Sequence, residues 1–184
     1  GKYSFAPSNY TFTIDRTLPT LTINSPQGET HSLLETIDLE VTTSDENGIE
    51  NMTATIERPG GTINSTELAH DSKNTYLGTY SSTGKVGQYN VTFNSTDEAG
   101  NSHVKESNFT IVDDIAPEVT INSPLDESMH ANGTDILIAI NATDLPVGTV
   151  DTVHVTITNS TGGGFFDKDL NESATPHIYN ATFN

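Results

Sequence analysis

Acidic residues stand at the ends of several expected β-strands of this 184-residue chain, where they could bind a metal ion. In the first part of the sequence they are Asp15, Asp45, Glu46, Asp97 and Glu98. In a seven-strand sandwich, the segment before the first strand and the loops after the second and sixth strands lie at one end, so these side chains should converge. Carboxylates from several loops are the hard oxygen ligands that Ca²⁺ prefers. The sequence therefore predicts a calcium site, although ordinary turns also favour Asp for backbone reasons.

The chain repeats itself once with a period of about 98 residues. TLPTLTINSP at 17–26 returns as IAPEVTINSP at 115–124, and the apolar positions that follow keep their phase. The repeat carries the acidic residues with it, which predicts a second calcium set at Asp113, Asp114 and Asp144. One period has the length of a single antiparallel β-sandwich, and a tandem array favours a surface or filament protein over an enzyme.

Acceptor motifs for N-glycosylation, Asn-X-Ser/Thr with X not Pro, are unusually frequent. They occupy 11 of the 17 Asn residues, and because Ser and Thr make up 45 of the 184 residues, chance would give about four. The excess favours extracellular N-glycosylation, although a chain rich in Thr and Asn also forms such motifs freely. The motif asparagines are Asn9, Asn51, Asn64, Asn90, Asn94, Asn108, Asn132, Asn141, Asn159, Asn171 and Asn180.

Catalytic motifs are absent from the sequence. The six histidines occur singly, the chain has no cysteine, and no His or Cys pair has the spacing of a transition-metal site. There is no Gly-X-Ser-X-Gly elbow and no phosphate-binding glycine loop. We therefore expect no enzymatic activity in this chain.

The charge balance narrows the class of partner. Seven Lys and Arg stand against 25 Asp and Glu, a formal net charge of −18, which argues against binding to a nucleic-acid backbone. No run of 18 apolar residues is present, so we expect no membrane insertion. Such acidity also serves solubility alone, including in salty surroundings.

The pattern along the chain predicts an all-β fold. Period-two alternation, frequent Thr and Val, and turn signals such as Asp45-Glu46-Asn47-Gly48 and Pro59-Gly60-Gly61 separate seven segments in the complete repeat. No segment shows a helical stripe. Seven strands at this spacing predict a Greek-key β-sandwich. The strands are expected near 20–25, 36–44, 51–57, 62–68, 75–81, 88–96 and 104–112.

The run from Gly87 to Asn101, GQYNVTFNSTDEAGN, followed by a strand, an Asp and a new Pro-X-Val-X-Ile-X-Ser-Pro, resembles the immunoglobulin-like repeats of bacterial and archaeal cell-surface proteins. The resemblance covers the whole chain and implies tandem immunoglobulin-like Greek-key sandwiches. It implies that the hydroxyl of Tyr89 bonds back to the backbone at a corner. Dense acceptor motifs with an acidic balance favour the archaeal members. The family serves as stalks, adhesins, surface layers and spacers of secreted enzymes, so the resemblance implies the fold and leaves these functions open.

The repeat predicts three parts. Residues 1–16 resemble the last two strands of a preceding or neighbouring unit, 17–114 form a complete domain, and 115–184 form a domain that lacks its final two strands. Such a domain should have an unpaired sheet edge and exposed inner-face side chains at Ile138, Ile140, Val153 and Val155. Either adjoining repeats of a longer chain or the N-terminal hairpin of another copy, donated head to tail, would complete it.

Together these patterns predict a non-enzymatic, extracellular, N-glycosylated structural protein of tandem immunoglobulin-like repeats. We expect it to assemble into a surface layer or an extracellular filament. Two alternatives stay open, an adhesin or carbohydrate-binding surface module and the spacer repeats of a large secreted enzyme. A sugar-binding face usually clusters exposed aromatic side chains, and the one conspicuous pair is Phe165-Phe166, which also fits the inward start of a strand.

Overall fold

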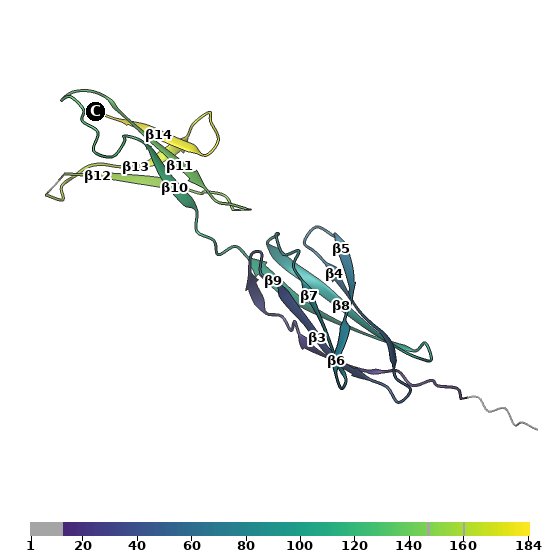
Figure 1. Ribbon diagram of the computed structural model, residues 1–184. Helices are drawn as coiled ribbons and strands as arrows, with labels where there is room; N and C mark the ends of the chain where they lie inside the picture. The colour runs from purple at the N-terminus through teal and green to yellow at the C-terminus, as the bar shows by residue number, and fades with distance from the viewer. Residues whose placement is uncertain (1–12, 147, 160) are drawn as a thin grey trace, which may run out of the picture. The chain divides into compact units, whose positions relative to one another are not determined.

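The computed structural model describes residues 13–146, 148–159 and 161–184, and all of their regular structure is β-strand. The chain divides into two compact units between Val112 and Asp113 (Figure 1). The described residues contain no helix that could cross a membrane. The expected hairpin within 1–16 lies mostly outside the described residues, and residues 13–19 belong to no strand.

The first unit is a sandwich of two sheets. One sheet has the strand order β1 (Thr20–Ser25), β3 (Ile37–Ser44), β7 (Thr75–Tyr80) and β6 (Ala69–Ser72). The other has the order β2 (Thr30–Ser32), β9 (Ser102–Val112), β8 (Gly87–Asp97), β4 (Ile49–Glu57) and β5 (Ile63–Glu67). All seven expected strands are present, and β2 and β6 are two short additions.

Period-two alternation builds the core between the sheets. Along β8, Tyr89, Val91 and Phe93 are fully buried, whereas Asn90 between them is exposed. The ring of Tyr89 stacks on that of Phe109, with ring centroids 4.8 Å apart. The hydroxyl of Tyr89 donates a hydrogen bond of 2.8 Å to the backbone carbonyl of Lys85, which confirms the expected corner.

The second unit has five strands in one sheet. Their order is β10 (Glu118–Ser123), β11 (Ile136–Thr143), β14 (Ile178–Phe183), β13 (Gly164–Glu172) and β12 (Val153–Thr158). β10, β11, β12 and β14 correspond to β1, β3, β4 and β7 of the first unit. β13 replaces both β5 and β6, because it pairs first with β12 and then with β14. Among the described residues of 113–184, no strand corresponds to β8 or β9.

The expectation that the inner-face side chains of the second unit are exposed is wrong for most of them. Ile138, Ile140 and Val153 are 4, 5 and 6% exposed. They are buried because β12 and β13 fold over and pack their apolar side chains against those of β11 and β14. Val155 is half-buried. A smaller core therefore forms within the second unit from the strands that the structure describes.

Candidate metal centre

Three of the predicted acidic residues come together at one end of the first unit. Asp15 lies before β1, Asp45 follows β3, and Asp97 ends β8. One carboxylate oxygen from each of them lies within 4.8 Å of the other two. Asp15 and Asp45 are half-buried and Asp97 is fully buried. This convergence is the one that the predicted order of strands and loops requires.

Two similar turns hold Asp45 and Asp97 in place. Oδ1 of Asp45 accepts a hydrogen bond from the backbone N–H of Asn47 at 2.9 Å, and Oδ1 of Asp97 accepts one from Ala99 at 2.9 Å. Each turn ends on a glycine with positive φ, Gly48 at 97° and Gly100 at 88°. This conformation is unfavourable for residues that have a Cβ atom. The backbone reasons for Asp at these positions are therefore real, and they fix the carboxylates where they meet.

Hydrogen bonds further restrain the cluster. Asp97 also accepts from the backbone N–H and the side-chain amide of Asn101, at 2.8 and 2.9 Å. Oδ2 of Asp15 accepts from the side-chain amide of Asn47 at 2.7 Å, and its Oδ1 accepts from Thr17. The hydrogen bonds from the side chain and backbone of Thr17, followed by the one from Asn47, lower the pKa of Asp15 below its usual value. Asp15 is therefore ionised at neutral pH.

The remaining candidates stay outside this group. Glu46 is exposed, and Glu98 lies against the turn, where its side chain covers Gly48. In the second unit, Asp113, Asp114 and Asp144 form no comparable group among the described residues. The reason is topological, because the counterpart of the central Asp97 would end a strand equivalent to β8.

The donor set of the cluster fits a hard cation. Every ion pair among the described residues joins a histidine to a carboxylate, so no Lys or Arg neutralises Asp15, Asp45 or Asp97. Two unit charges 4 Å apart repel by about 1 kcal/mol in water and about 4 kcal/mol near a protein surface. The three carboxylates come from separate segments of the chain and repel one another. A bound Ca²⁺ ion would relieve this repulsion, since carboxylate oxygens are its preferred ligands.

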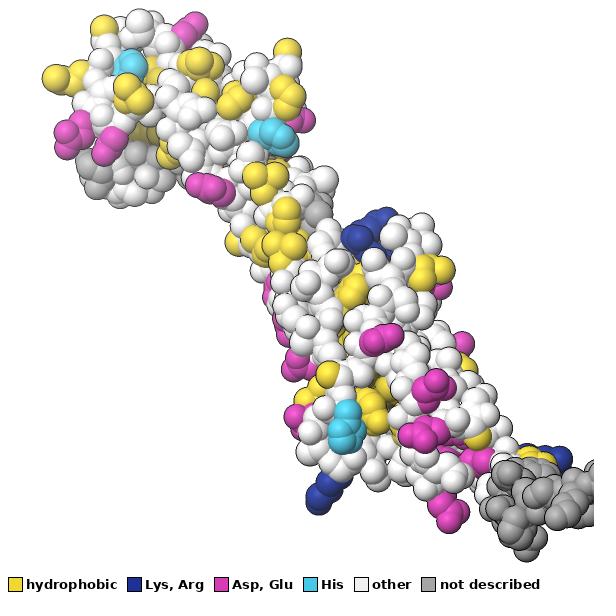
Figure 2. Space-filling view, turned by 45° about the vertical axis from the view of Figure 1, so that its right-hand side comes forward, with side chains coloured by type: hydrophobic (Ala, Val, Ile, Leu, Met, Phe, Trp, Pro, Cys, Tyr) yellow, Lys and Arg dark blue, Asp and Glu magenta, His cyan; other side chains and the backbone are white. Residues whose placement is uncertain are grey.

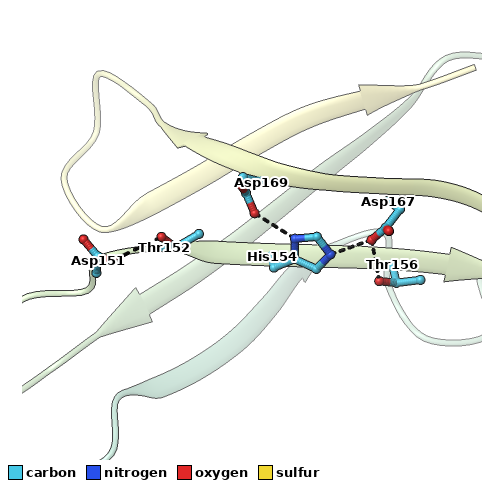
Figure 3. Close-up of polar contacts among 6 residues, drawn as sticks. All are labelled: Asp151, Thr152, His154, Thr156, Asp167 and Asp169. Atoms are coloured by element: carbon cyan, nitrogen blue, oxygen red, sulfur yellow. Dashed lines mark hydrogen bonds and ion pairs between the residues drawn. The ribbon is translucent and has the colours of Figure 1, made fainter.

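A second polar site, which the sequence did not reveal, lies on the β12–β13 hairpin of the second unit (Figure 3). His154 on β12 lies between two aspartates of β13, with Nδ1 2.7 Å from Oδ1 of Asp169 and Nε2 2.5 Å from Oδ1 of Asp167. Thr156 donates a hydrogen bond of 3.0 Å to the same oxygen of Asp167. Only the pairing of β12 with β13 brings these residues together, because His154 stands 13 and 15 positions before them.

The two aspartates should make this hairpin sensitive to pH. Hydrogen bonding to Asp169, then to Asp167, raises the pKa of His154 above 6.5, and the bond from His154 lowers the pKa of Asp167 below 3.8. Protonation of His154 therefore stabilises the hairpin below pH 6.5, and this contribution is lost as pH rises through the folded pKa. The contribution of Asp167 is present above pH 3.8 and is lost as pH falls through its folded pKa.

We expect an NMR titration to give His154 a pKa above that of the model peptide. Replacing Asp169 by Asn should lower this pKa, because the hydrogen bond that raises it most is weakened. The control Asp151→Asn removes the same charge close to β12 without touching the imidazole, since Asp151 bonds Thr152. Equal pKa values in the two variants would show that the contact with Asp169 does not form in solution.

None of the acceptor asparagines that the structure describes is buried. Asn51, Asn64, Asn90, Asn132, Asn159, Asn171 and Asn180 are exposed, and Asn94, Asn108 and Asn141 are half-buried. Asn9 lies outside the described residues. Two pairs stand directly opposite each other on neighbouring strands, Asn90 with Asn108 and Asn171 with Asn180. Oδ1 of Asn94 is enclosed without a hydrogen-bond partner, which makes Asn94 the least suitable acceptor among them.

The surface is acidic and carries few exposed aromatics. Figure 2 shows Asp and Glu side chains spread over the visible faces of both units, with few Lys or Arg among them. Of the aromatic pair, Phe166 packs edge-on against Phe183 with ring centroids 5.9 Å apart, whereas Phe165 is 62% exposed. The interpretation of this pair as the inward start of a strand is therefore correct for Phe166 alone.

The order of the strands decides the fold family. In the first unit, β1-β3-β7-β6 faces β9-β8-β4, the order of the two sheets of an immunoglobulin domain, and Tyr89 forms its corner. The chain is built from immunoglobulin-like repeats. No protein-family model and no curated protein sequence matches this chain.

Several solved structures resemble the immunoglobulin-like chain at low identity. The fibronectin(III)-like modules of Clostridium thermocellum CbhA match 89% of it and 78% of their own length, with 16% identity and a TM-score of 0.41. A tetra-tandem repeat from the extending region of a large adhesion protein gives 19% identity and a TM-score of 0.40. A Ca²⁺-stabilised, ice-binding adhesin of an Antarctic bacterium gives 16% and 0.33. Each of these last two matches includes 89% of this chain but only 40% of the other protein's length.

Proposed function

We propose that this chain is a non-enzymatic, extracellular structural protein whose N-glycosylated immunoglobulin-like repeats assemble into a surface layer or filament. The observation that carries the proposal is the placement of the acceptor asparagines. None of those within the described residues is buried, and several lie on the outward faces of strands, as Asn90 does on β8. Glycans on such positions cover the sheets and leave the cores undisturbed.

The rest of the molecule supports a structural role. The side chains that the sandwich buries in the first unit are apolar packing residues, with Thr43, Thr83, Ser95 and Asp97 as the buried polar ones. Asp97 serves the turn already described, and Thr43 and Ser95 bond each other at 2.7 Å. These groups hold strands and loops together and include no pair suited to nucleophilic or acid–base chemistry.

A calcium ion at Asp15, Asp45 and Asp97 would make one end of the first unit more rigid, which suits a structural role. It would tie the segment before β1 to the loops after β3 and β8, and so order the entry of the chain into the first unit. Asp15 and Asp45 are half-buried and lie close to Asp97, and Ca²⁺ would supply the positive charge that no Lys or Arg of the described residues brings to them through an ion pair.

Glycopeptide mapping of native protein tests the proposal. We expect glycans on several of Asn51, Asn64, Asn90, Asn94, Asn108, Asn132 and Asn141, with the lowest occupancy at Asn94. Side chains directly opposite on neighbouring strands have Cβ atoms about 5 Å apart. Occupancy should therefore be exclusive within the pairs Asn90/Asn108 and Asn171/Asn180 on any one molecule. Unmodified asparagine at every acceptor site of the native protein would refute the proposal.

A further inference from the structure

We propose that the second unit binds residues 2–14 of a second copy of this chain, which add to the free edge of β12 as a β-hairpin and complete the sandwich. The inference rests on the proposed structural function and names the surface and the segment through which copies join.

The second unit carries an open apolar groove. Its volume is about 850 Å³, and its floor and walls include Ile121, Ile138, Ile140, Val155 and Ile157. It lies where β10 and β11 face β12. Its apolar lining suits large apolar side chains, since one aromatic side chain buries roughly 150–250 Å² of surface.

The first unit shows what covers the same surface in a complete sandwich. The counterparts of Ile138, Ile140 and Val155 there are Leu39, Val41 and Ala54, and all three are 0% exposed. They are sealed by side chains of β8 and β9, whose Phe93 and Phe109 are also 0% exposed. The groove thus marks the volume that a hairpin equivalent to β8 and β9 fills.

The exposure of apolar side chains on β10 also indicates that this surface of the second unit is uncovered. Leu21 on β1 is 3% exposed, whereas its counterpart Val119 on β10 is 57% exposed. Ile23 is partly buried against the core of the first unit, and its counterpart Ile121 is 63% exposed. Two large aliphatic side chains on adjacent inward positions of a strand are costly to leave in water.

β12 offers the edge to which a strand can be added. β4 pairs with β5 on one side and β8 on the other, whereas β12 pairs with β13 on one side. Among the described residues, its other edge has no strand partner. Free edges of this kind recruit extended segments through backbone hydrogen bonds.

Residues 1–14 carry the side-chain pattern of the missing hairpin. Gly1-Lys2-Tyr3-Ser4-Phe5 matches Gly87–Val91, and Phe12-Thr13-Ile14 matches Phe109-Thr110-Ile111. The first unit already contains β8 and β9, so it has no place for a second such hairpin. Of this segment the structure describes Thr13 and Ile14, and neither belongs to a strand; Ile14 is 64% exposed.

The pairing of β8 with β9 also sets a register for the donated hairpin. Tyr89 stands opposite Phe109, which transfers to Tyr3 opposite Phe12 and then to Phe5 opposite Tyr10. The connection left between them is Ala6-Pro7-Ser8-Asn9, a sequence rich in turn formers. In this register all the aromatic side chains and Ile14 share one face, as an insert for an apolar groove requires.

The register on β12 follows from the same comparison. Ile56 of β4 stands opposite Val91 of β8, and their counterparts are Ile157 and the donor's Phe5. Charge favours the contact as well. The rim of the groove includes Asp126 and Glu127, whereas residues 1–14 contain Lys2 and no acidic residue.

A donor at one end of the chain and an acceptor in its second unit make a head-to-tail contact. Such a contact joins different surfaces of two copies, so it continues from copy to copy unless the rotation closes a ring. The 184-residue chain should therefore form oligomers whose mass grows with concentration, as light scattering after size exclusion measures. A version that lacks residues 1–14 should be monomeric.

A synthetic peptide of residues 1–15, added to the truncated chain, tests the groove itself. We expect the peptide to bind one to one, and Ile121→Asp in the truncated chain to weaken it at least tenfold. Ile63→Asp is the matched control, because Ile63 on β5 is 62% exposed, close to the 63% of Ile121, and should leave binding unchanged. Since both substitutions are at exposed positions, both variants should keep the circular dichroism of the parent.

Three results would overturn the proposal. They are a monomeric 184-residue chain, oligomers that persist without residues 1–14, and a peptide that binds Ile121→Asp as tightly as the parent. A chain whose groove is filled by its own N-terminus gives the first result. Each of these outcomes leaves the glycan mapping unaffected, so the failure of strand donation and the failure of the structural function can be told apart.

Discussion

Calcium is expected to raise the melting temperature of the first unit by roughly 10–20 °C when its concentration is 100 times the dissociation constant. Binding to the folded state alone contributes about 2.7 kcal/mol at that concentration, and 1 kcal/mol shifts the midpoint of a domain of this size by about 4–8 °C. The physical cause is the meeting of Asp15, Asp45 and Asp97 within 4.8 Å, with no ion pair to a Lys or Arg of the described residues. Calorimetry with calcium and with chelator measures the shift.

Two substitutions distinguish calcium binding at this site from general screening of acidic charges by a divalent ion. Asp45→Asn removes one ligand charge but keeps an oxygen that can accept from the N–H of Asn47, so the turn survives and the calcium shift should shrink. Asp38→Asn removes an equal charge from an exposed position on β3 and should leave the shift unchanged. Superimposable curves with calcium and with chelator would mean that the three aspartates only shape turns.

Replacement of Phe109 by Ala should destabilise the first unit by about 3–5 kcal/mol, as for other large buried aromatic side chains. The ring of Phe109 is 0% exposed, stacks on Tyr89 and meets His31 edge-on with centroids 6.1 Å apart. Its loss opens a cavity between both sheets. The melting temperature of this unit should fall by at least about 10 °C, while that of the second unit should not change.

The matched control is Phe165→Ala, because this phenylalanine is 62% exposed on β13. Its effect should stay within about 0.5 kcal/mol, as is usual for surface positions. Denaturant unfolding of both variants makes the comparison. Equal losses of stability from Phe109→Ala and Phe165→Ala would contradict the placement of the first core.

The strands were predictable because alternation is strong where one face of a sheet is buried. Tyr89, Val91 and Phe93 mark the inner face of β8 in the sequence as clearly as they do in the structure. β2 was not predictable, since it has three residues and exists only through parallel pairing with β9. β6 was missed because the chain leaves one sheet for the other around Leu68, which is buried and breaks the alternation.

The candidate site was predictable in part. Topology alone brings Asp15, Asp45 and Asp97 together, because the order of the loops is fixed by the order of the strands. It could not show that Glu46 points into solvent, since that depends on the conformation of the turn. The contact of His154 with Asp167 and Asp169 depends on the register of one hairpin, and a shift of one residue would place them on opposite faces.

The burial of Ile138 and Ile140 needed the structure. The described residues of the second unit include no strands equivalent to β8 and β9, and the sequence does not show that β12 and β13 can close over β11 and β14. That closure covers β11 and leaves β10 open, with Val119 57% exposed. The difference between these two strands defines the groove.

The mass of the native protein before and after chemical deglycosylation tests the central claim most directly. The 184 residues account for 19.7 kDa, and no acceptor asparagine among the described residues is buried. A glycosylated surface protein should lose the mass of several glycans on treatment. A native protein whose mass is unchanged by deglycosylation would contradict the account.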